Sequence, residues 1–207
     1  MLSERKKLKR DLASGQATGK ALAVLLDRDG TLIRDVGHLS RVEKIELLPG
    51  VPEAIRLLRR NGLKVVIVTN QSAVGRGFLT ESGLAQIHHE LTRLLAISGA
   101  VLDAIYYCPH HPTEGLGAYG TACECRKPNA GLAQKAAEEL NLDLGRSYVV
   151  GDQSSDMELA LRIGAKGIRI RDRGPEGGEL EDKAALVVVE DLWEAAQWIV
   201  RDLYGRR

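Results

Sequence analysis

The sequence contains few aromatic residues, since Phe, Trp and Tyr together make up 4% of its 207 residues. It also has no excess of charge of either sign, because 29 Lys and Arg oppose 28 Asp and Glu, for a formal net charge of +1. Proteins that bind single-stranded nucleic acid combine a basic groove with aromatic side chains on which the bases stack. The composition therefore argues against nucleic acid and anionic membranes as partners, and an anionic ligand would need local positive charges.

The sequence also lacks an apolar run of the roughly 20 residues that a membrane-spanning helix needs. Its N-terminus carries basic residues without the apolar stretch that follows them in a secretory signal, so we expect a soluble, cytoplasmic protein. Residues 1–20 have no sustained apolar period and are predicted to form a flexible basic arm. Residues 21–207 have the length of one ordinary domain, which we expect to be monomeric.

Short apolar runs alternate with segments of helical periodicity from residue 21 onward. Strands are predicted at residues 21–26, 63–68, 103–107, 147–150, 167–170 and 185–189, and helices at residues 51–60, 80–98, 131–140, 155–163 and 192–203. The last helix begins with Asp191 and Glu194 in capping-box spacing. The uninterrupted apolar run at 65–68 is typical of a central strand that helices cover on both faces. The sequence therefore predicts an α/β fold, a doubly wound parallel sheet.

Two carboxylates follow the first predicted strand, in the segment Asp27-Arg28-Asp29-Gly30-Thr31. Successive side chains of a strand point to opposite faces, so Asp27 and Asp29 reach the same cleft if the chain stays extended. One carboxylate can then attack a phosphorus atom, while the second protonates the leaving oxygen and later activates water. The segment therefore favours phosphoryl transfer. The alternative is an ordinary turn rich in Asp and Gly after a strand.

Polar residues also follow two later strands, at the end of the sheet where open α/β folds bind ligands. Thr69, Asn70, Gln71 and Ser72 come after the strand at 63–68, and Asp152 comes after the strand at 147–150. The Thr69 hydroxyl and nearby backbone N–H groups could hold the oxygens of a transferring phosphoryl group. The same four residues are equally compatible with the opening of an ordinary loop.

Asp27, Asp29 and Asp152 are predicted to converge at this edge of the sheet. Two carboxylates about 4 Å apart repel by roughly 4 kcal/mol at an effective dielectric constant of about 20, so the cluster needs a compensating cation. Oxygen ligands and a phosphate substrate favour Mg²⁺, bound by the side chains of Asp27 and Asp152 and by the backbone carbonyl of Asp29. Asp156 is expected to orient the loop after Asp152 rather than to bind the metal.

All three cysteines lie between residues 108 and 128, about twenty residues without helical or strand periodicity. They form the pattern Cys108-x-His110, twelve intervening residues, and Cys123-x-Cys125. Three thiolates and one imidazole suit a closed tetrahedral zinc site, which would be structural because it has no open position. His111 could replace His110 as the fourth ligand. A disulfide with one remaining thiol is the alternative, and a cytoplasmic location disfavours it.

Arg126 and Lys127 follow the last cysteine directly, so a zinc site would deliver both side chains to a defined position. The Lys127 ammonium can neutralise the charge of a phosphorylated aspartate. The Arg126 guanidinium suits bidentate contact with a second phosphate or with a sugar hydroxyl. A solvated basic pair on the surface is the alternative interpretation.

The motif D-x-D-G-T, a strand that ends in Thr-Asn, a lysine before a helix and G-D-x-x-x-D resemble the haloacid dehalogenase-like phosphatases over about residues 22–170. The segments Y-Y-C-P-H-H-P and C-E-C-R-K-P are similar to the zinc-loop branch of that family, which lacks a large cap domain. The resemblance implies that Asp27 is the nucleophile and Asp29 the general acid and base. It further implies that Thr69 and Lys127 hold the phosphoryl group and that Asp152 completes the Mg²⁺ site.

Members of this branch remove phosphate from heptose 1,7-bisphosphates, for lipopolysaccharide precursors, or from histidinol phosphate, for histidine. Thr-Asn-Gln-Ser followed by Gly-Arg-Gly resembles the heptose-specific members, and this resemblance implies the C7 phosphate of a D-glycero-D-manno-heptose 1,7-bisphosphate as the substrate. The resemblance implies substrate contacts by residues of several loops, namely Asp35, His38, Asn70, Gln71, Ser72, Arg126 and Gln153. Gln153 stands where a lysine is expected. The alternative from a different functional class is a non-catalytic protein that uses the zinc loop as an interaction surface.

Overall fold

A computed structural model describes residues 19–171 and 185–205 of the protein. Nearly all of the predicted N-terminal arm, residues 1–18, lies outside the described residues. Within the described part of the chain, no helix is both long enough and apolar enough to cross a membrane.

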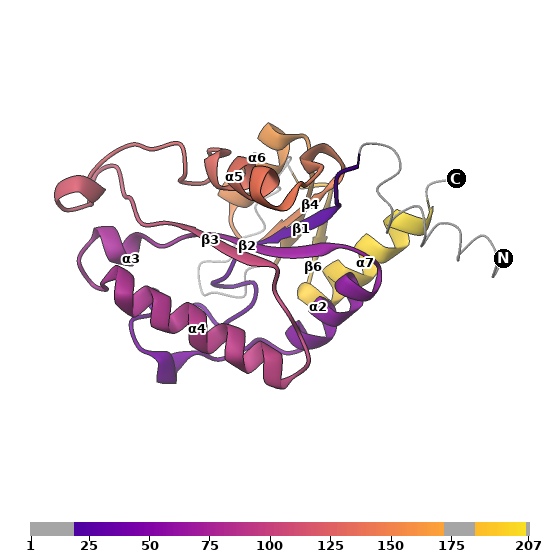
Figure 1. The fold of residues 1–207 in the computed structure, drawn as a ribbon, viewed down its shortest axis with the longest axis horizontal. Coiled ribbons are helices and arrows are strands. Elements are labelled where there is room, and N and C mark those ends of the chain that lie inside the picture. Colours follow the sequence, from indigo (N-terminus) through magenta and orange to yellow (C-terminus); the bar gives the residue numbers. More distant parts are fainter. Residues whose placement is uncertain (1–18, 172–184, 206–207) are drawn as a thin grey trace.

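The described residues form one parallel sheet of six strands in the order β3-β2-β1-β4-β5-β6 (Figure 1). The strands are β1 (Ala23–Leu26), β2 (Lys64–Asn70), β3 (Ala104–Cys108), β4 (Tyr148–Gly151), β5 (Lys166–Ile170) and β6 (Val187–Val189). Strand β1 lies at the centre of the sheet, β2 and β3 follow on one side of it, and β4, β5 and β6 follow on the other side. This order is that of a doubly wound sheet, so the predicted α/β fold is confirmed.

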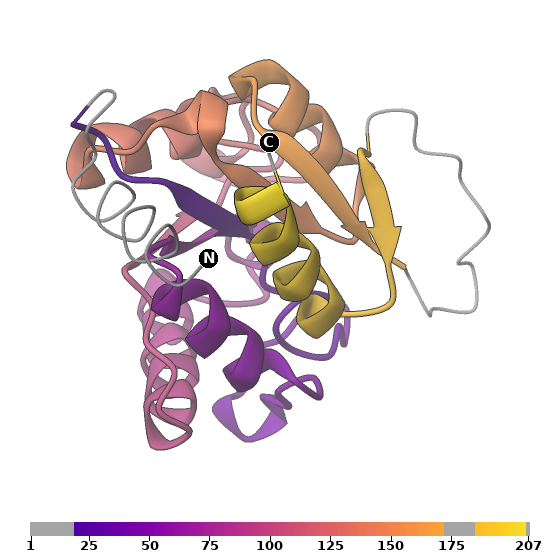
Figure 2. The same cartoon turned by 90° about the vertical axis from the view of Figure 1, so that its right-hand side faces the viewer.

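Helices cover both faces of the sheet (Figure 1). One face carries α2 (Val51–Arg60), α4 (Glu81–Ile97) and α7 (Leu192–Gly205), and the other carries α5 (Gly131–Leu140) and α6 (Ser154–Ile163). A short helix, α3 (Ser72–Gly75), follows β2, and single 3₁₀ turns occur at η1 (Val42–Lys44), η2 (Gly117–Tyr119) and η3 (Leu144–Arg146). Figure 2 shows α2 and α7 side by side on their face of the sheet.

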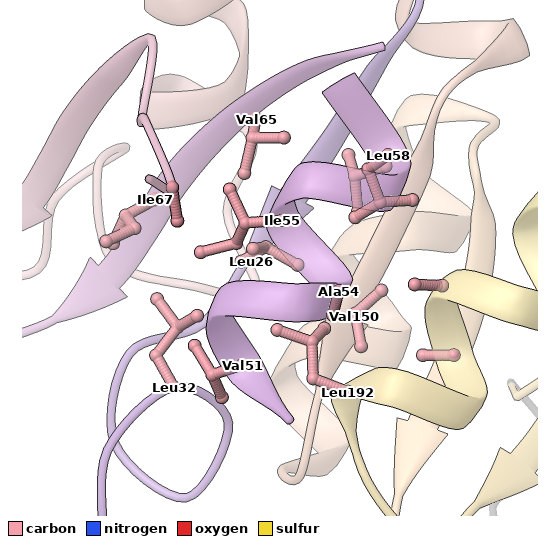
Figure 3. Packing of buried hydrophobic residues seen from close by; sticks show 14 of the residues in the cluster. Leu26, Leu32, Val51, Ala54, Ile55, Leu58, Val65, Ile67, Val150 and Leu192 are labelled. Carbon is pink, nitrogen blue, oxygen red and sulfur yellow. The ribbon is translucent and has the colours of Figure 1, made fainter. Parts of the chain in front are cut away.

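The central strands contribute alternate side chains to two hydrophobic cores, one on each face. In β1, Val24 and Leu26 belong to the core under α2 and α7, whereas Ala23 and Leu25 belong to the core under α5 and α6. Figure 3 shows Leu26 of β1 and Ile55 of α2 among the packed side chains of the first core. Because both faces are buried, a central strand needs an uninterrupted apolar sequence rather than an alternating one.

The sequence-based element boundaries agree closely with the structure. The helices predicted at 51–60 and 131–140 have these bounds, and the ends of the other predicted elements shift by one or two residues. The short α3 and the 3₁₀ turns were not predicted, because they are too short to show periodicity. At the start of α7, Asp191 Oδ1 accepts from the Glu194 N–H as expected, but the Glu194 carboxylate accepts from the N–H of Glu190 instead of Asp191.

Candidate active site

The carboxyl ends of β1, β2 and β4 lie next to each other at one edge of the sheet. Leu26, the last residue of β1, pairs with Ile67 of β2 and with Val150 of β4. The backbone pairing continues for one more residue, because the Asp27 N–H donates to the carbonyl oxygen of Val150 at 2.9 Å. This register brings together the side chains that follow the three strands.

A buried lysine lies between two carboxylates at this edge. Lys127 Nζ donates to Asp27 Oδ1 and to Asp156 Oδ1, both at 2.6 Å. Burial would lower the pKa of the Lys127 ammonium, but the charges of Asp156 and Asp27 outweigh it and raise that pKa above its usual value. Lys127 therefore stays charged beside Asp27. Asp156 holds it there, and sequence reasoning did not predict this contact.

Three buried carboxylates cluster at this edge of the sheet, and two of them contact the lysine. Asp27, Asp152 and Asp156 each offer a carboxylate oxygen, and these oxygens lie within 4.8 Å of one another. Burial, together with the charge of Asp27, raises the pKa of Asp152 to about 7. Burial also raises the pKa of Asp156 to about 6, although the Lys127 charge opposes this rise. One ammonium compensates only part of the buried negative charge, so an added cation would stabilise the ionised cluster.

Hydrogen bonding distinguishes the carboxylates that could bind such a cation. Asp152 Oδ1 is buried and has no hydrogen-bond partner among the described residues. Asp156 uses both oxygens, since Oδ1 accepts from Lys127 and Oδ2 accepts from the Gln153 N–H at 3.2 Å. The oxygen donors of Asp27 and Asp152 therefore fit a hard divalent cation such as Mg²⁺. Asp156 fits the role of an anchor for Lys127.

Two glycines allow the backbone to approach these carboxylates. A Cβ atom at Gly30 would collide with the carboxylate of Asp152, and a Cβ atom at Gly151 would collide with that of Asp156. Gly30 also has a φ of +74°, a conformation that other residues rarely adopt. The turn after Asp29 and the loop after β4 can therefore meet closely around the site.

Asp29 has different partners from the other carboxylates. β1 ends at Leu26, and the chain bends at Arg28. Arg28 Nη2 lies 2.9 Å from each oxygen of Asp29, and Gln71 Nε2 donates to Asp29 Oδ2 at 2.8 Å. Burial raises the pKa of Asp29, although the Arg28 charge opposes this rise. The Asp29 side chain is still 21% exposed, so its carboxyl group can exchange protons with a bound molecule.

The polar side chains at the end of β2 are engaged mainly with other parts of the protein. The Asn70 amide forms two hydrogen bonds with the backbone of Lys127, at 3.0 and 3.1 Å. Gln71 is buried, and its Nε2 donates to Thr69 Oγ1 at 3.0 Å as well as to Asp29. Asn70 thus fixes the backbone that carries the buried lysine, while Gln71 connects Thr69 to Asp29.

Two predicted substrate residues, Asp35 and His38, lie in the exposed segment after β1. Asp35 Oδ1 accepts from the Gly37 N–H at 2.8 Å, which closes a local turn. The ring centroid of His38 lies 4.9 Å from that of Phe78, in the segment between α3 and α4. Their contact with a substrate stays a prediction.

Arg126 and Gln153 each contact a residue of a predicted metal site. Arg126 Nη1 donates to the carbonyl oxygen of His110 at 3.1 Å, which holds the guanidinium against the cysteine-containing loop. Gln153 is exposed, and its Nε2 donates to Asp152 Oδ2 at 2.9 Å. Gln153 therefore carries no charge to the site and reaches it through Asp152. Whether either residue binds substrate also stays a prediction.

The loop after β3 brings the cysteines together with one histidine. Ligand atoms of Cys108, His110, Cys123 and Cys125 lie within 4.8 Å of one another, and the three thiols are not joined by disulfides. His111 points to other partners, with Nε2 3.2 Å from Arg76 Nη2. The geometry thus favours His110 over His111 as the fourth member. Three sulfur atoms and one imidazole nitrogen at this spacing suit Zn²⁺.

Two residues of the site were given no role from sequence. Arg28 is 1% exposed, and its guanidinium contacts Asp29, Gln71 and His88. In D-x-D, Arg28 occupies the position that the pattern leaves unspecified. His88 lies sixty residues further along the chain, in α4. The one available signal is that Arg28 lies two residues after a fully buried apolar strand, where a guanidinium would need buried partners.

Comparisons with known proteins agree with this arrangement. A family model described as haloacid dehalogenase-like hydrolase matches residues 24–98, and a model described as HAD-hydrolase-like matches residues 124–195. The fold, these matches and the identities below show that the chain belongs to the haloacid dehalogenase-like hydrolases, and within them it is a phosphatase.

The chain is 38% identical over 183 residues to the D-glycero-beta-D-manno-heptose-1,7-bisphosphate 7-phosphatase of Yersinia pestis, covering 87% of this chain and 90% of the relative. It is 40% identical over 192 residues to the D-glycero-D-manno-heptose-1,7-bisphosphate 7-phosphatase of Thermosynechococcus vestitus, covering 89% and 98%. Among solved structures, D,D-heptose 1,7-bisphosphate phosphatase from B. bronchiseptica, complexed with magnesium and phosphate, matches with a TM-score of 0.72 and 31% identity, covering 87% and 99%.

Proposed function

We propose that this phosphatase removes the C7 phosphate of D-glycero-D-manno-heptose 1,7-bisphosphate in an Mg²⁺-dependent reaction through an aspartyl-phosphate at Asp27. The observation that carries the proposal is the buried Lys127 ammonium, 2.6 Å from the Asp27 carboxylate at the end of β1. Positive charge beside the attacking group favours the approach of an anionic phosphate. The names of the two relatives and of the structural neighbour support the heptose substrate.

In the first half of the proposed reaction, Asp27 attacks the phosphorus atom. Lys127 binds Oδ1 of Asp27, so we assign the attack to Oδ2. A bond forms between Oδ2 and phosphorus while the bond between phosphorus and the C7 oxygen breaks. The Asp29 carboxyl group donates its proton to that oxygen, and the sugar leaves as an alcohol. Asp27 then carries the phosphoryl group.

In the second half, water releases the phosphoryl group. Asp29, now ionised, takes a proton from water as the water oxygen bonds to phosphorus. The bond between phosphorus and Asp27 Oδ2 breaks, which restores the Asp27 carboxylate and leaves inorganic phosphate. Asp29 is again protonated for the next turnover. Burial supports this dual role, because it raises the pKa of Asp29 and makes the protonated form more accessible.

The proposed Mg²⁺ site consists of the Asp27 and Asp152 carboxylates and the backbone carbonyl of Asp29. When bound, the ion would supply positive charge to the phosphoryl oxygens. The buried Asp152 Oδ1, which lacks a hydrogen-bond partner within the described residues, supports this donor set. Asp156 maintains the position of Lys127 through a second hydrogen bond to its ammonium.

The assignments of Asp152 and Asp156 predict different kinetic effects. We expect Asp152→Asn to raise the Mg²⁺ concentration for half-maximal activity at least about 10-fold, because one anionic ligand is lost. Asp156→Asn should mainly lower kcat, because Lys127 loses a charged anchor, with little change in the Mg²⁺ requirement. Phosphate release measured against Mg²⁺ concentration checks both. An equal Mg²⁺ requirement in the wild type and Asp152→Asn would contradict the ligand assignment.

Substrate contacts are proposed for Asp35, His38, Thr69, Asn70, Ser72, Arg126, Lys127 and Gln153. For Gln71 the structure supports a different role from the one expected from sequence. Its amide oxygen accepts from Arg28, and its amide nitrogen donates to Asp29 and Thr69. Those bonds use both N–H donors, so we propose that Gln71 acts within the protein and not on the sugar.

We propose a structural Zn²⁺ bound by Cys108, His110, Cys123 and Cys125. The four ligand atoms converge from the end of β3 and from the segment that leads into Arg126 and Lys127. Binding the metal would therefore fix the loop on which the catalytic lysine depends.

Loss of a zinc ligand should lower both metal content and stability. Cys123→Ser and His110→Gln are expected to purify with less than one zinc per chain and to melt about 10 °C lower, because the loop loses its cross-link. His111→Gln is the matched control and should keep the wild-type zinc content. Metal analysis and thermal melting check this, and unchanged zinc in Cys123→Ser would contradict the site.

The substrate proposal is tested by phosphate release in the presence of Mg²⁺ from the α and β anomers of heptose 1,7-bisphosphate and from histidinol phosphate. We expect a higher kcat/KM for a heptose bisphosphate, and the anomers then show which one is preferred. A higher kcat/KM for histidinol phosphate would overturn the substrate and leave the mechanism intact. No turnover of any phosphate ester would instead favour a non-catalytic role.

A further inference from the structure

Arg28 is among the largest fully buried side chains of the described residues, yet the proposed reaction gives it no task. A buried guanidinium is costly unless its charge and its N–H groups find partners. Its charge is balanced by Asp29, the adjacent residue, through contacts of Nη2 at 2.9 Å to both carboxylate oxygens and of Nε at 3.2 Å to Oδ1. Arg28 therefore constrains the carboxyl group to which the proton transfers are assigned.

Two neutral groups in turn hold the guanidinium of Arg28. Gln71 Oε1 accepts from Nη2 at 2.8 Å, and His88 Nε2 lies 3.3 Å from Nη1. Gln71 also donates to Asp29 Oδ2, so it bonds to both members of the Arg28–Asp29 pair. Gln71 on Nη2 and His88 on Nη1 thus fix the plane of the guanidinium. Because the Asp29 carboxylate binds in that plane, its orientation is fixed as well.

His88 suits the role of an acceptor. It lies in α4 beside the core residues Ile87 and Leu91, and its ring packs against that of Tyr107 in a T-shaped arrangement at a centroid distance of 5.6 Å. Burial, with the nearby charge of Arg28, lowers the pKa of His88 to about 4. The imidazole is therefore neutral at physiological pH, and Nε2 can accept a hydrogen bond while Nδ1 carries the proton.

We propose that His88, Arg28 and Gln71 form a positioning network that holds the Asp29 carboxyl group in the orientation for proton transfer, so that His88 controls turnover without touching the substrate. The inference rests on the proposed function of Asp29. It adds a helix on one face of the sheet, α4, to the elements that determine the catalytic geometry. A misplacement of about 1 Å at a catalytic group can cost on the order of 100-fold in rate.

The test compares His88→Leu with His88→Gln, which keeps an acceptor, and with His89→Leu, which changes the exposed neighbour on the same helix. We expect His88→Leu to lower kcat about 10- to 100-fold with KM within about twofold of wild type. His88→Gln should recover most of kcat, and His89→Leu should match the wild type. Gln71→Met provides a second route to the same carboxyl group if His88→Leu does not fold.

A leaving-group series separates positioning from general destabilisation. The rate of phosphoryl transfer in a single turnover is measured with alkyl phosphates, whose leaving oxygen needs a proton, and with nitrophenyl phosphate, whose leaving oxygen needs it less. The defect of His88→Leu should be larger for the alkyl phosphates. An equal loss on both substrates, or a kcat equal to that of His89→Leu, would overturn the inference.

Asp29→Asn, measured in the same series, separates failure of the inference from failure of the proposed function. If Asp29→Asn turns over alkyl phosphates as fast as the wild type, the assigned role of Asp29 is wrong. If Asp29→Asn is inactive while His88→Leu retains full kcat, the proton-transfer role stands and only the positioning network is wrong.

Discussion

Asp27→Asn is expected to abolish phosphate release, with kcat lowered by about 10⁴-fold or more, because the amide cannot form the aspartyl-phosphate. The substitution is isosteric and removes one of three clustered carboxylates, while Lys127 keeps its hydrogen bond to Asp156. The variant should therefore remain folded. Phosphate release from heptose 1,7-bisphosphate, with thermal melting alongside, measures both parts of this prediction.

The matched control for Asp27→Asn is Glu158→Gln, which removes an exposed carboxylate from α6 without reaching the site. It should retain wild-type turnover. Detection of a phosphorylated Asp27 in the wild type after acid quenching would support the covalent step directly. Turnover by Asp27→Asn at the wild-type rate would contradict the covalent mechanism.

Lys127→Met has the second-largest expected effect, because it removes the ammonium from the buried carboxylate cluster. Breaking a buried ion pair by deleting one partner typically costs about 3–5 kcal/mol of stability, and we expect a loss of that order without Mg²⁺. Activity should fall about 100- to 1000-fold, as when a charge-stabilising donor is removed from an active site. Lys135→Met, at an exposed position of α5, should change neither quantity measurably.

A double variant separates the two consequences of losing Lys127. In Lys127→Met with Asp156→Asn, one of the uncompensated carboxylates is also neutralised, so part of the lost stability should return. Activity should not return, because the Lys127 ammonium that contacts Asp27 is still missing. Denaturant unfolding and phosphate release measure the two effects. If Lys127→Met were as stable as Lys135→Met, the proposed balance of buried charge would be wrong.

The apolar run of β2 allowed the parallel α/β sheet to be predicted from the sequence. Residues 65–68 are apolar without alternation because helices cover both faces of the strand, and such a pattern leaves few alternatives to a central parallel strand. Helices α2 and α5 were equally clear, because their periodicity spans several turns. The four-residue α3 showed no such signal, since one helical turn has no repeat.

The parts of the candidate site that could be predicted from the sequence are those in which a chemically suitable residue type follows the end of a strand. Asp27, Thr69 and Asp152 follow three strands that a parallel sheet must align, and the cysteines and His110 carry a metal-ligand spacing in their own sequence. His88 carried no comparable signal, and the G-D-x-x-x-D motif that contains Asp156 did not indicate its contact with Lys127. A histidine on the inner side of a helix has the same appearance whether it fills space or holds an arginine.

The sequence by itself thus determined the sheet, the strand ends that carry the carboxylates and the three cysteine ligands of the candidate zinc site, because each follows from local periodicity or spacing. The structure decided between His110 and His111 as the fourth ligand. Only the tertiary structure decided how the buried charges are paired. Lys127 meets Asp27 and Asp156 across 100 and 29 residues of chain, and Arg28 meets His88 across 60. Such pairings depend on side-chain positions to within an ångström, whereas a periodic pattern specifies only which face a residue occupies.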